Sequence, residues 1–274
     1  MKTAPKDAAT IVLVRSCADR NVSDIEVLLV LRNVKSSFLP GYHVFPGGAL
    51  DPEDYQSGME RFVRGMGQAE AARILTDMSL PEKALGVWVA AIRETFEEAG
   101  TLFAKGKDGT PVFLEQKEQR KRFEKYRRGL NCKKMKFIRM LEEEEIFLSA
   151  DSLHYFSHWI TPEIFPLRYD VRFFVAEFPA GQSAIHDGEE LVDHIWLRPA
   201  AALEAYSAGR MNMILPQIMT LEELSRFQTV SDIIASAQSR HISAHLTKIS
   251  NVNGQNVEVM PDGTVFEMRP PVYP

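Results

Sequence analysis

Two runs of β-branched and aliphatic residues stand near the start of the chain, at 9–14 and 25–31. A polar stretch separates them, so they predict neighbouring antiparallel strands. A third short strand is expected at 42–45, followed by proline and the pair Gly47 and Gly48. Because glycine permits close approach of the backbone, we expect a sharp turn there, with main-chain N–H groups available to a ligand.

Helical spacing of apolar residues is clearest over 84–99, which ends at Gly100. Before it, Ser79 to Glu82 has the form of an N-terminal capping box with proline in the first turn. Similar patterns predict an α/β protein with one or two helices at 59–78, helices at 114–130, 133–148, 199–208, 215–226 and 229–241, strands at 156–160, 168–178 and 191–197, and a hairpin of 256–260 with 264–268.

Composition narrows the class of protein. The chain has 274 residues, of which 45% are hydrophobic and 25% charged, which is typical of a globular protein. Its two cysteines, Cys17 and Cys132, have the spacing of neither a disulfide framework nor a thiolate zinc site. No apolar run is long enough for a membrane span and no cleavage site follows the first residues, so we expect a cytoplasmic protein without a membrane partner. The net charge of −5 makes a nucleic-acid partner unlikely.

Candidate chemistry lies on the helix at 84–99. Glu94, Glu97 and Glu98 share one helical face, where their like charges repel one another. A divalent cation turns that repulsion into binding, and carboxylate ligands suit Mg²⁺ or Mn²⁺ better than zinc. Arg93 can pair with these carboxylates and orient them. The alternative is a solvated acidic face of an ordinary helix.

The order of a strand, a diglycine and this acidic helix resembles the Nudix hydrolase signature. Residues 93–100, RETFEEAG, match its charged positions and its glycine. Thr95 and Thr101 stand where the family prefers bulky aliphatic residues, and Asp54 stands where it has glutamate. The two halves of the signature are separated by an insertion of about 31 residues at 55–85. A loop of this length costs little extra entropy, so the halves can still meet.

The insertion and three further segments resemble one branch of the family, the peroxisomal coenzyme A diphosphatases and their bacterial relatives. These segments are 37–48 (SFLPGYHVFPGG), 158–162 (HWITP) and 168–174 (RYDVRFF). Val171 replaces the threonine of the last segment. The resemblance covers roughly residues 8–228 and leaves the C-terminal part unexplained.

The resemblance implies a Nudix-type α/β/α sandwich with a mixed sheet and a helical cap. It places the Nudix domain at 1–240, with the insertion at about 55–85 within the signature and the cap at about 112–149. Residues 241–274 are then a C-terminal extension with a β-hairpin.

The resemblance also implies a diphosphatase that hydrolyses phosphoanhydride bonds with Mg²⁺ or Mn²⁺. Its expected substrate is coenzyme A or acyl-CoA, and ADP-ribose, nucleotide sugars and dinucleoside polyphosphates are alternatives. Glu94, Glu97 and Glu98 are the expected metal ligands, with Arg93 beside them. The expected substrate-binding residues are Gly47, Gly48, Trp159 and Arg168.

Hydrolysis needs a general base, and the sequence leaves several candidates. Glu94 is one, and the sequence Asp-Gly-Glu-Glu at 187–190 offers Glu189 and Glu190 as a base or an extra metal ligand. A solvated turn is the ordinary interpretation of such a sequence.

Other features stay open at this point. Residues 117–139 hold eleven Lys or Arg and two Glu, a basic run that either receives substrate phosphates or forms a solvated helix face. His154 and His158 have helical ligand spacing, but no third ligand stands near them in sequence. A noncatalytic ligand sensor or RNA-binding module on the same scaffold is the alternative to an enzyme, and a homodimer is possible.

Overall fold

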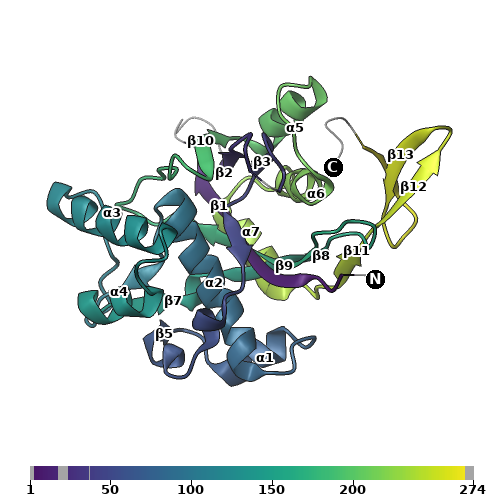
Figure 1. The fold of residues 1–274 in the computed structure, drawn as a ribbon. Coiled ribbons are helices and arrows are strands. Elements are labelled where there is room, and N and C mark those ends of the chain that lie inside the picture. The colour runs from purple at the N-terminus through teal and green to yellow at the C-terminus, as the bar shows by residue number, and fades with distance from the viewer. Residues whose placement is uncertain (1–2, 18–23, 37, 269–274) are drawn as a thin grey trace.

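A mixed sheet forms the centre of the computed structural model, which describes residues 3–17, 24–36 and 38–268 (Figure 1). Its strands follow the order β10-β2-β1-β9-β8-β11, with β3 paired to β2 and β4 paired to β1. The pairs β1–β9 and β8–β11 are parallel and the others antiparallel. The strands are β1 (Lys6–Ser16), β2 (Ile25–Arg32), β3 (His43–Val44), β4 (Gly47–Ala49), β8 (His154–Ile160), β9 (Tyr169–Glu177), β10 (Leu191–Leu197) and β11 (Ala244–Leu246).

Helices cover both faces of this sheet. They are α1 (Gln68–Ile74), α2 (Pro81–Ala99), α3 (Lys117–Asn131), α4 (Phe137–Glu144), α5 (Pro199–Ser207), α6 (Leu215–Leu224) and α7 (Val230–Ser239). Along β1, Ile11 and Leu13 belong to the core beneath α2, whereas Val12 and Val14 belong to the core beneath α6 and α7. This alternation is the two-residue period of a strand with both faces buried. The predicted α/β/α sandwich with a mixed sheet is confirmed.

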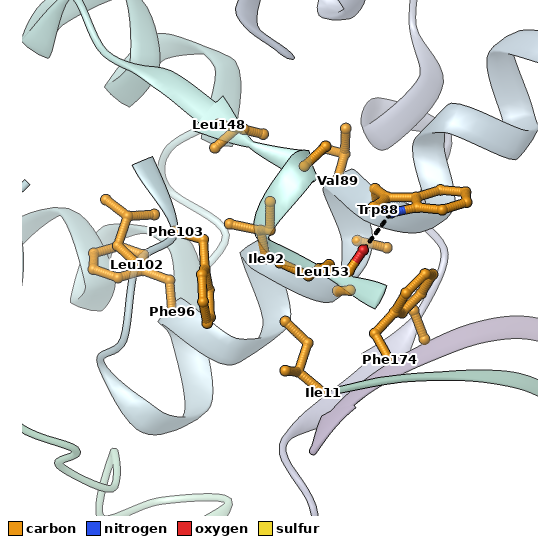
Figure 2. Close-up of a cluster of buried hydrophobic side chains, with 14 of the residues drawn as sticks. Ile11, Trp88, Val89, Ile92, Phe96, Leu102, Phe103, Leu148, Leu153 and Phe174 are labelled. Atoms are coloured by element: carbon orange, nitrogen blue, oxygen red, sulfur yellow. Dashed lines mark hydrogen bonds between the residues drawn. The ribbon is translucent and has the colours of Figure 1, made fainter. Parts of the chain in front are cut away.

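Helix α2 is packed into the core along almost its whole length. Figure 2 shows its side chains Trp88, Val89, Ile92 and Phe96 against Ile11 of β1 and other core residues. The Trp88 ring lies 4.8 Å from the ring of Phe174, and its indole N–H points to the carbonyl of Leu153 at 3.4 Å. The end of the helix that carries the acidic residues is therefore fixed to the sheet.

The segment 59–78 is less helical than its pattern predicts. Residues Met59–Phe62 form a 3-10 turn, Val63–Arg64 form the short strand β5, and only α1 is an α-helix. Glycines interrupt the helical path, because Gly58 and Gly65 both adopt positive φ. Strand β5 pairs with β7 (Phe147–Ser149), which also pairs with β6 (Ala104–Lys105), so this small sheet connects the insertion to the cap.

The predicted cap helices are present with shorter bounds. Helix α3 begins at Lys117 and α4 spans only Phe137–Glu144, since the residues before and after α4 form turns and the strand β7. Glu145 ends α4 in the left-handed conformation, with φ of 51°. Pairing with β5 and β6 overrides the local helical pattern at 147–148.

Two local predictions around the signature are wrong. The residue that precedes α2 is Leu80, and no side chain caps the helix there, because Ser79 lies one position too early. Gly47 and Gly48 do not form a sharp turn but belong to β4, where they pair with Thr10 and Ala9 of β1.

The C-terminal part adds strands to the domain. Strand β11 joins the main sheet beside β8, and β12 (Lys248–Val252), β13 (Gln255–Val259) and β14 (Val265–Glu267) form a separate antiparallel sheet. The predicted turn at 261–263 joins β13 and β14, and the β12–β13 hairpin projects away from the main body (Figure 1). The predicted polar connection at 18–23 and the final residues 269–274 lie outside the described residues.

Within the described ranges, none of the helices combines the length and apolar character that a bilayer span requires.

Candidate active site

The acidic residues occupy the last turns of α2, which ends at Gly100 with φ of 67°. The glycine allows the left-handed conformation that stops the helix directly after Ala99, one residue beyond Glu98. Glu94, Glu97 and Glu98 keep the spacing of one helical face. Glu98 is 5% exposed, so this is not the solvated face that the alternative interpretation requires.

An ion pair joins the two halves of the signature across the insertion. The Arg93 guanidinium donates from Nε to Asp54 Oδ1 at 2.8 Å and from a terminal nitrogen to Asp54 Oδ2 at 2.9 Å. Asp54 is 1% exposed and also accepts the backbone N–H of Asp51. The aspartate thus pairs with Arg93 despite the intervening insertion.

Arg93 also orients the carboxylates next to it. Its remaining terminal nitrogen lies 2.8 Å from Glu94 Oε1 and 3.3 Å from Glu97 Oε2. A further bond to the carbonyl of Ala49 at 3.1 Å connects it to β4. One buried guanidinium therefore holds three carboxylates and the backbone of the diglycine strand in one arrangement.

The diglycine contacts the acidic helix directly. The backbone N–H of Gly47 donates to Glu98 Oε2 at 2.8 Å. A Cβ atom at Gly48 would lie 2.4 Å from the carboxyl carbon of Glu94, which is closer than real side chains approach. Glycine at this position therefore leaves the space that the Glu94 carboxylate fills.

Burial and mutual repulsion disfavour the charged forms of these glutamates. Burial raises the pKa of Glu94 and Glu97, that of Glu97 to about 7, although Arg93 lowers both. Burial, with the charges of Glu94 and Glu190, holds the pKa of Glu98 well above its ordinary value. Among the described residues, ion pairs at this helix reach Glu94 and Glu97 but not Glu98.

The donor chemistry of Glu94, Glu97 and Glu98 suits a divalent cation, because three carboxylates with a single neighbouring arginine carry excess negative charge and hard oxygen ligands suit ions of the Mg²⁺ type. Their ligand atoms do not all lie within 4.8 Å of one another; among the described residues those of Asp77, His158 and Asp170 do. The cost of holding the ionised groups together would be offset by such an ion.

A cleft of about 330 Å³ opens beside the diglycine, and Glu94 and Glu98 line one end of it. We call it the aromatic cleft, because its walls include Phe38, Phe45, Trp159, Tyr169 and Phe173. The rings of Phe38 and Tyr169 meet edge to face at 5.1 Å. The cleft combines an apolar wall with an acidic end, a combination typical of ligand sites.

The two candidate glutamates of the 187–190 turn are placed differently. Glu190 lines the aromatic cleft and accepts a 2.8 Å hydrogen bond from Arg32. Glu189 is exposed and does not line it; its backbone carbonyl accepts a bond from Asn33. The structure thus brings Glu190, but not Glu189, to the acidic helix.

The two predicted substrate-binding residues of the β8–β9 region also separate. Trp159 lines the aromatic cleft, and its ring lies 4.7 Å from that of His245. Arg168 is not among the residues that line the cleft, and its role in substrate binding stays a prediction. Its guanidinium is buried and donates to the backbone carbonyls of Thr161 and Thr3 at 3.0 and 2.8 Å.

Several residues that line the cleft were missed from sequence. Arg32, at the end of β2, brings a cation to the cleft, and Thr247 and Glu258 come from the C-terminal part. Burial raises the pKa of Glu258, which bonds to Thr247. The sequence offers one signal for Arg32, an arginine at the end of an apolar strand. It offers no such signal for Thr247 and Glu258.

A second group of possible ligands lies outside both the helix and the cleft. Asp77, His158 and Asp170 have ligand atoms within 4.8 Å of one another, so His158 does have acidic neighbours that its sequence context does not reveal. Arg172, 1% exposed, pairs with both aspartates and with Asp7. Because Arg172 supplies a cation to both aspartates, this group forms an ion-pair network in the structure.

Comparisons with known proteins agree with this geometry. The NUDT19 Nudix domain family matches residues 60–226, more than half of the chain. The chain is 28% identical over 239 residues to acyl-coenzyme A diphosphatase NUDT19 of Xenopus laevis, covering 78% of this chain and 63% of that protein. The human protein of the same name is 27% identical over 239 residues, with 76% and 62% covered.

A solved structure extends the likeness to the fold. The crystal structure of a NUDIX hydrolase from Alicyclobacillus acidocaldarius matches with a TM-score of 0.66 and 26% identity, covering 85% of this chain and 96% of that one. The chain spans less than two thirds of the length of the Xenopus and human relatives. From the matched domain, the fold and the arrangement of the signature, the chain belongs to the Nudix family, in the branch described by the NUDT19 Nudix domain.

Proposed function

We propose that this protein hydrolyses the diphosphate linkage of coenzyme A or acyl-CoA, with Mg²⁺ or Mn²⁺ as cofactor. One observation carries the proposal. Three carboxylates share one helical face, and a 2.8 Å hydrogen bond from the Gly47 N–H to Glu98 joins that face to the diglycine strand. The names of the matched relatives, acyl-coenzyme A diphosphatases, support this choice of substrate.

Glu94, Glu97 and Glu98 would hold the metal, and Arg93 keeps their side chains in place. The bound ion would supply charge neutralisation for the diphosphate and would lower the pKa of a coordinated water. In the overall reaction, water adds to one phosphorus, the bond from that phosphorus to the bridging oxygen breaks, and two phosphate monoesters leave. The water's protons pass to the leaving oxygen and to solvent through a general base.

The cleft offers two glutamates for proton transfer. Glu190 lies at the acidic end, paired with Arg32, and Glu94 lies against Gly48. We propose that one of them is the general base. Trp159 and the other rings of the aromatic cleft would contact the apolar pantetheine or acyl part of the substrate, because aromatic rings bury such groups.

The test is a substrate panel with Mg²⁺ or Mn²⁺, containing coenzyme A, acetyl-CoA, ADP-ribose, a nucleotide sugar and a dinucleoside polyphosphate. We expect kcat/KM to be highest for the two coenzyme A compounds and chelation of the metal to abolish turnover. Highest activity on another member of the panel would replace the substrate. Turnover of none of them would favour a ligand sensor.

Two variants connect any observed activity to the acidic helix. Glu98→Gln preserves the shape of the side chain and should lower kcat by about 100-fold or more, as expected when a charge-stabilising group is lost. Glu118→Gln, on the exposed side of α3, is the matched control and should leave kcat unchanged. Equal rates for the two variants would exclude a role for Glu98 in turnover.

A further inference from the structure

A second cleft, of about 690 Å³, also borders the signature, through Arg93 and Glu97. We call it the basic cleft, because Lys133, Lys134, Lys136 and Arg139 line it, together with the acidic residues Asp51, Glu53, Glu97 and Glu143. Glu97 lines this cleft, whereas Glu94 and Glu98 line the aromatic one. The acidic end of α2 therefore borders two clefts that share no lining residue.

Contacts between α3 and α2 fix the basic cleft beside the signature. Arg127 of α3 donates to the backbone carbonyls of Glu97 and Glu98, and the Asn131 side chain donates to that of Glu97 at 3.3 Å. Lys133 follows Asn131 by two residues, so their Cα atoms are at most about 7.6 Å apart. Lys133 and Lys134 thus directly follow a helix end that is fixed to α2.

The charges of this cleft are only partly neutralised by the protein. Lys136 pairs with Glu53 at 2.8 Å, and Arg139 pairs with Glu142 at 3.1 Å. Lys133 and Lys134 have no ion pair with any described residue within 4.0 Å. Two ammonium groups without an ion pair among the described residues therefore line the same cleft as Glu97.

The turn that carries these lysines is a Schellman motif with an unusual residue. The N–H of Lys133 donates to Leu130 at 2.7 Å and that of Lys134 to Gly129 at 2.8 Å, which closes the end of α3. Lys133 has φ of 53°, the left-handed conformation that favours glycine at this position of the motif. The chain thus carries a lysine at a cost to the local backbone, which points to a use for its side chain.

We propose that the basic cleft binds a phosphate monoester of the substrate, separate from the diphosphate that is cleaved, and that Lys133 and Lys134 contact it. This inference rests on the proposed function. An ammonium group offers three donors and a compact charge, which suits the terminal oxygens of a monoester. In coenzyme A, the 3′-phosphate of the ribose is such a group.

Binding of adenosine 3′,5′-bisphosphate and of AMP, measured by calorimetry in the presence of Mg²⁺, tests the subsite without requiring turnover. We expect the unaltered protein to bind the bisphosphate about tenfold more tightly than AMP, the ratio that two ion pairs at exposed positions provide. We expect Lys133→Ala with Lys134→Ala to remove this difference. Lys121→Ala with Lys125→Ala, on the exposed surface of α3, is the matched control and should preserve it.

A single variant separates binding from folding. Lys133→Gly should raise the melting temperature, because glycine accepts the left-handed conformation, while it weakens bisphosphate binding by severalfold. With coenzyme A and its 3′-dephospho form as substrates, the same variant should raise KM for the first and not for the second.

Equal affinity of the unaltered protein for bisphosphate and AMP would overturn the subsite, whatever the outcome of the turnover assay. Persistence of the difference in the Lys133 and Lys134 double variant would overturn the assignment of these residues. Failure of the proposed function would appear elsewhere, as absence of coenzyme A hydrolysis by the unaltered protein.

Discussion

Replacing Arg127 by methionine is expected to weaken the contact between the helical cap and α2 and so to lower the free energy of unfolding. Arg127 is 8% exposed and donates hydrogen bonds to the carbonyls of Glu97 at 2.8 Å and Glu98 at 2.5 Å. These carbonyls lie in the last turn of α2, where a helix leaves its C=O groups without intrahelical partners and favours a nearby cation. Methionine retains much of the apolar stem but neither donor.

The size of the effect follows from these contacts. A hydrogen bond from a charged donor contributes about 1.5–3 kcal/mol. Asn131 still donates to Glu97 in the variant, so only Glu98 loses its sole side-chain donor among the described residues. Burial lowers the pKa of Arg127, and losing that desolvation cost offsets part of the change. We therefore expect the free energy of unfolding to fall by about 2–4 kcal/mol.

Urea unfolding followed by far-ultraviolet circular dichroism measures this change. Arg128→Met is the matched control, because Arg128 is the next residue of α3 and is exposed. Its effect should stay within about 0.5 kcal/mol, as for most surface substitutions. If the two variants unfold at the same urea concentration, the contacts of Arg127 with α2 do not stabilise the protein and the reasoning is refuted.

Three further substitutions probe the signature itself. Asp54→Ala leaves the buried charge of Arg93 without its bidentate partner, so the free energy of unfolding should fall by about 3–5 kcal/mol. Urea unfolding measures this change, and a decrease of less than about 1 kcal/mol would contradict the prediction. Gly47→Ala would place a Cβ 2.3 Å from a backbone carbonyl of β1, so we expect a lower melting temperature, and an unchanged one would contradict the register. In Gly48→Ala the new Cβ meets the flexible Glu94 side chain, so the melting temperature should change little. The affinity for Mg²⁺, measured by calorimetry, should fall at least tenfold. An unchanged affinity would show that Glu94 does not bind the metal.

The parts of the fold that could be predicted are those with local signals. Helix α2 and its end at Gly100 follow from apolar spacing and from a glycine that accepts the left-handed conformation. The strands β1 and β2 follow from continuous apolar runs, as expected for strands buried on both faces. Short strands such as β5 and β7 could not be predicted, because pairing between distant segments decides them.

The candidate site could likewise be predicted only where the signal is local. The acidic residues share a helical turn, so sequence spacing alone groups Glu94, Glu97 and Glu98. The resemblance predicts a substrate contact for Arg168, whereas in the structure its guanidinium donates to the carbonyl of Thr161 in its own hairpin and to that of Thr3 near the N-terminus. The sequence shows Arg32 at the end of an apolar strand, but its place in the cleft beside the acidic helix depends on the fold.

The position of α2 between two separate clefts has a consequence for the release of products. Glu94 and Glu98 border one opening and Glu97 the other, and the two openings have no lining residue in common. Once the diphosphate linkage of the proposed substrate is cleaved, the two products would leave through different clefts. Each half would then inhibit the enzyme independently, and saturation by one would not prevent the other from binding.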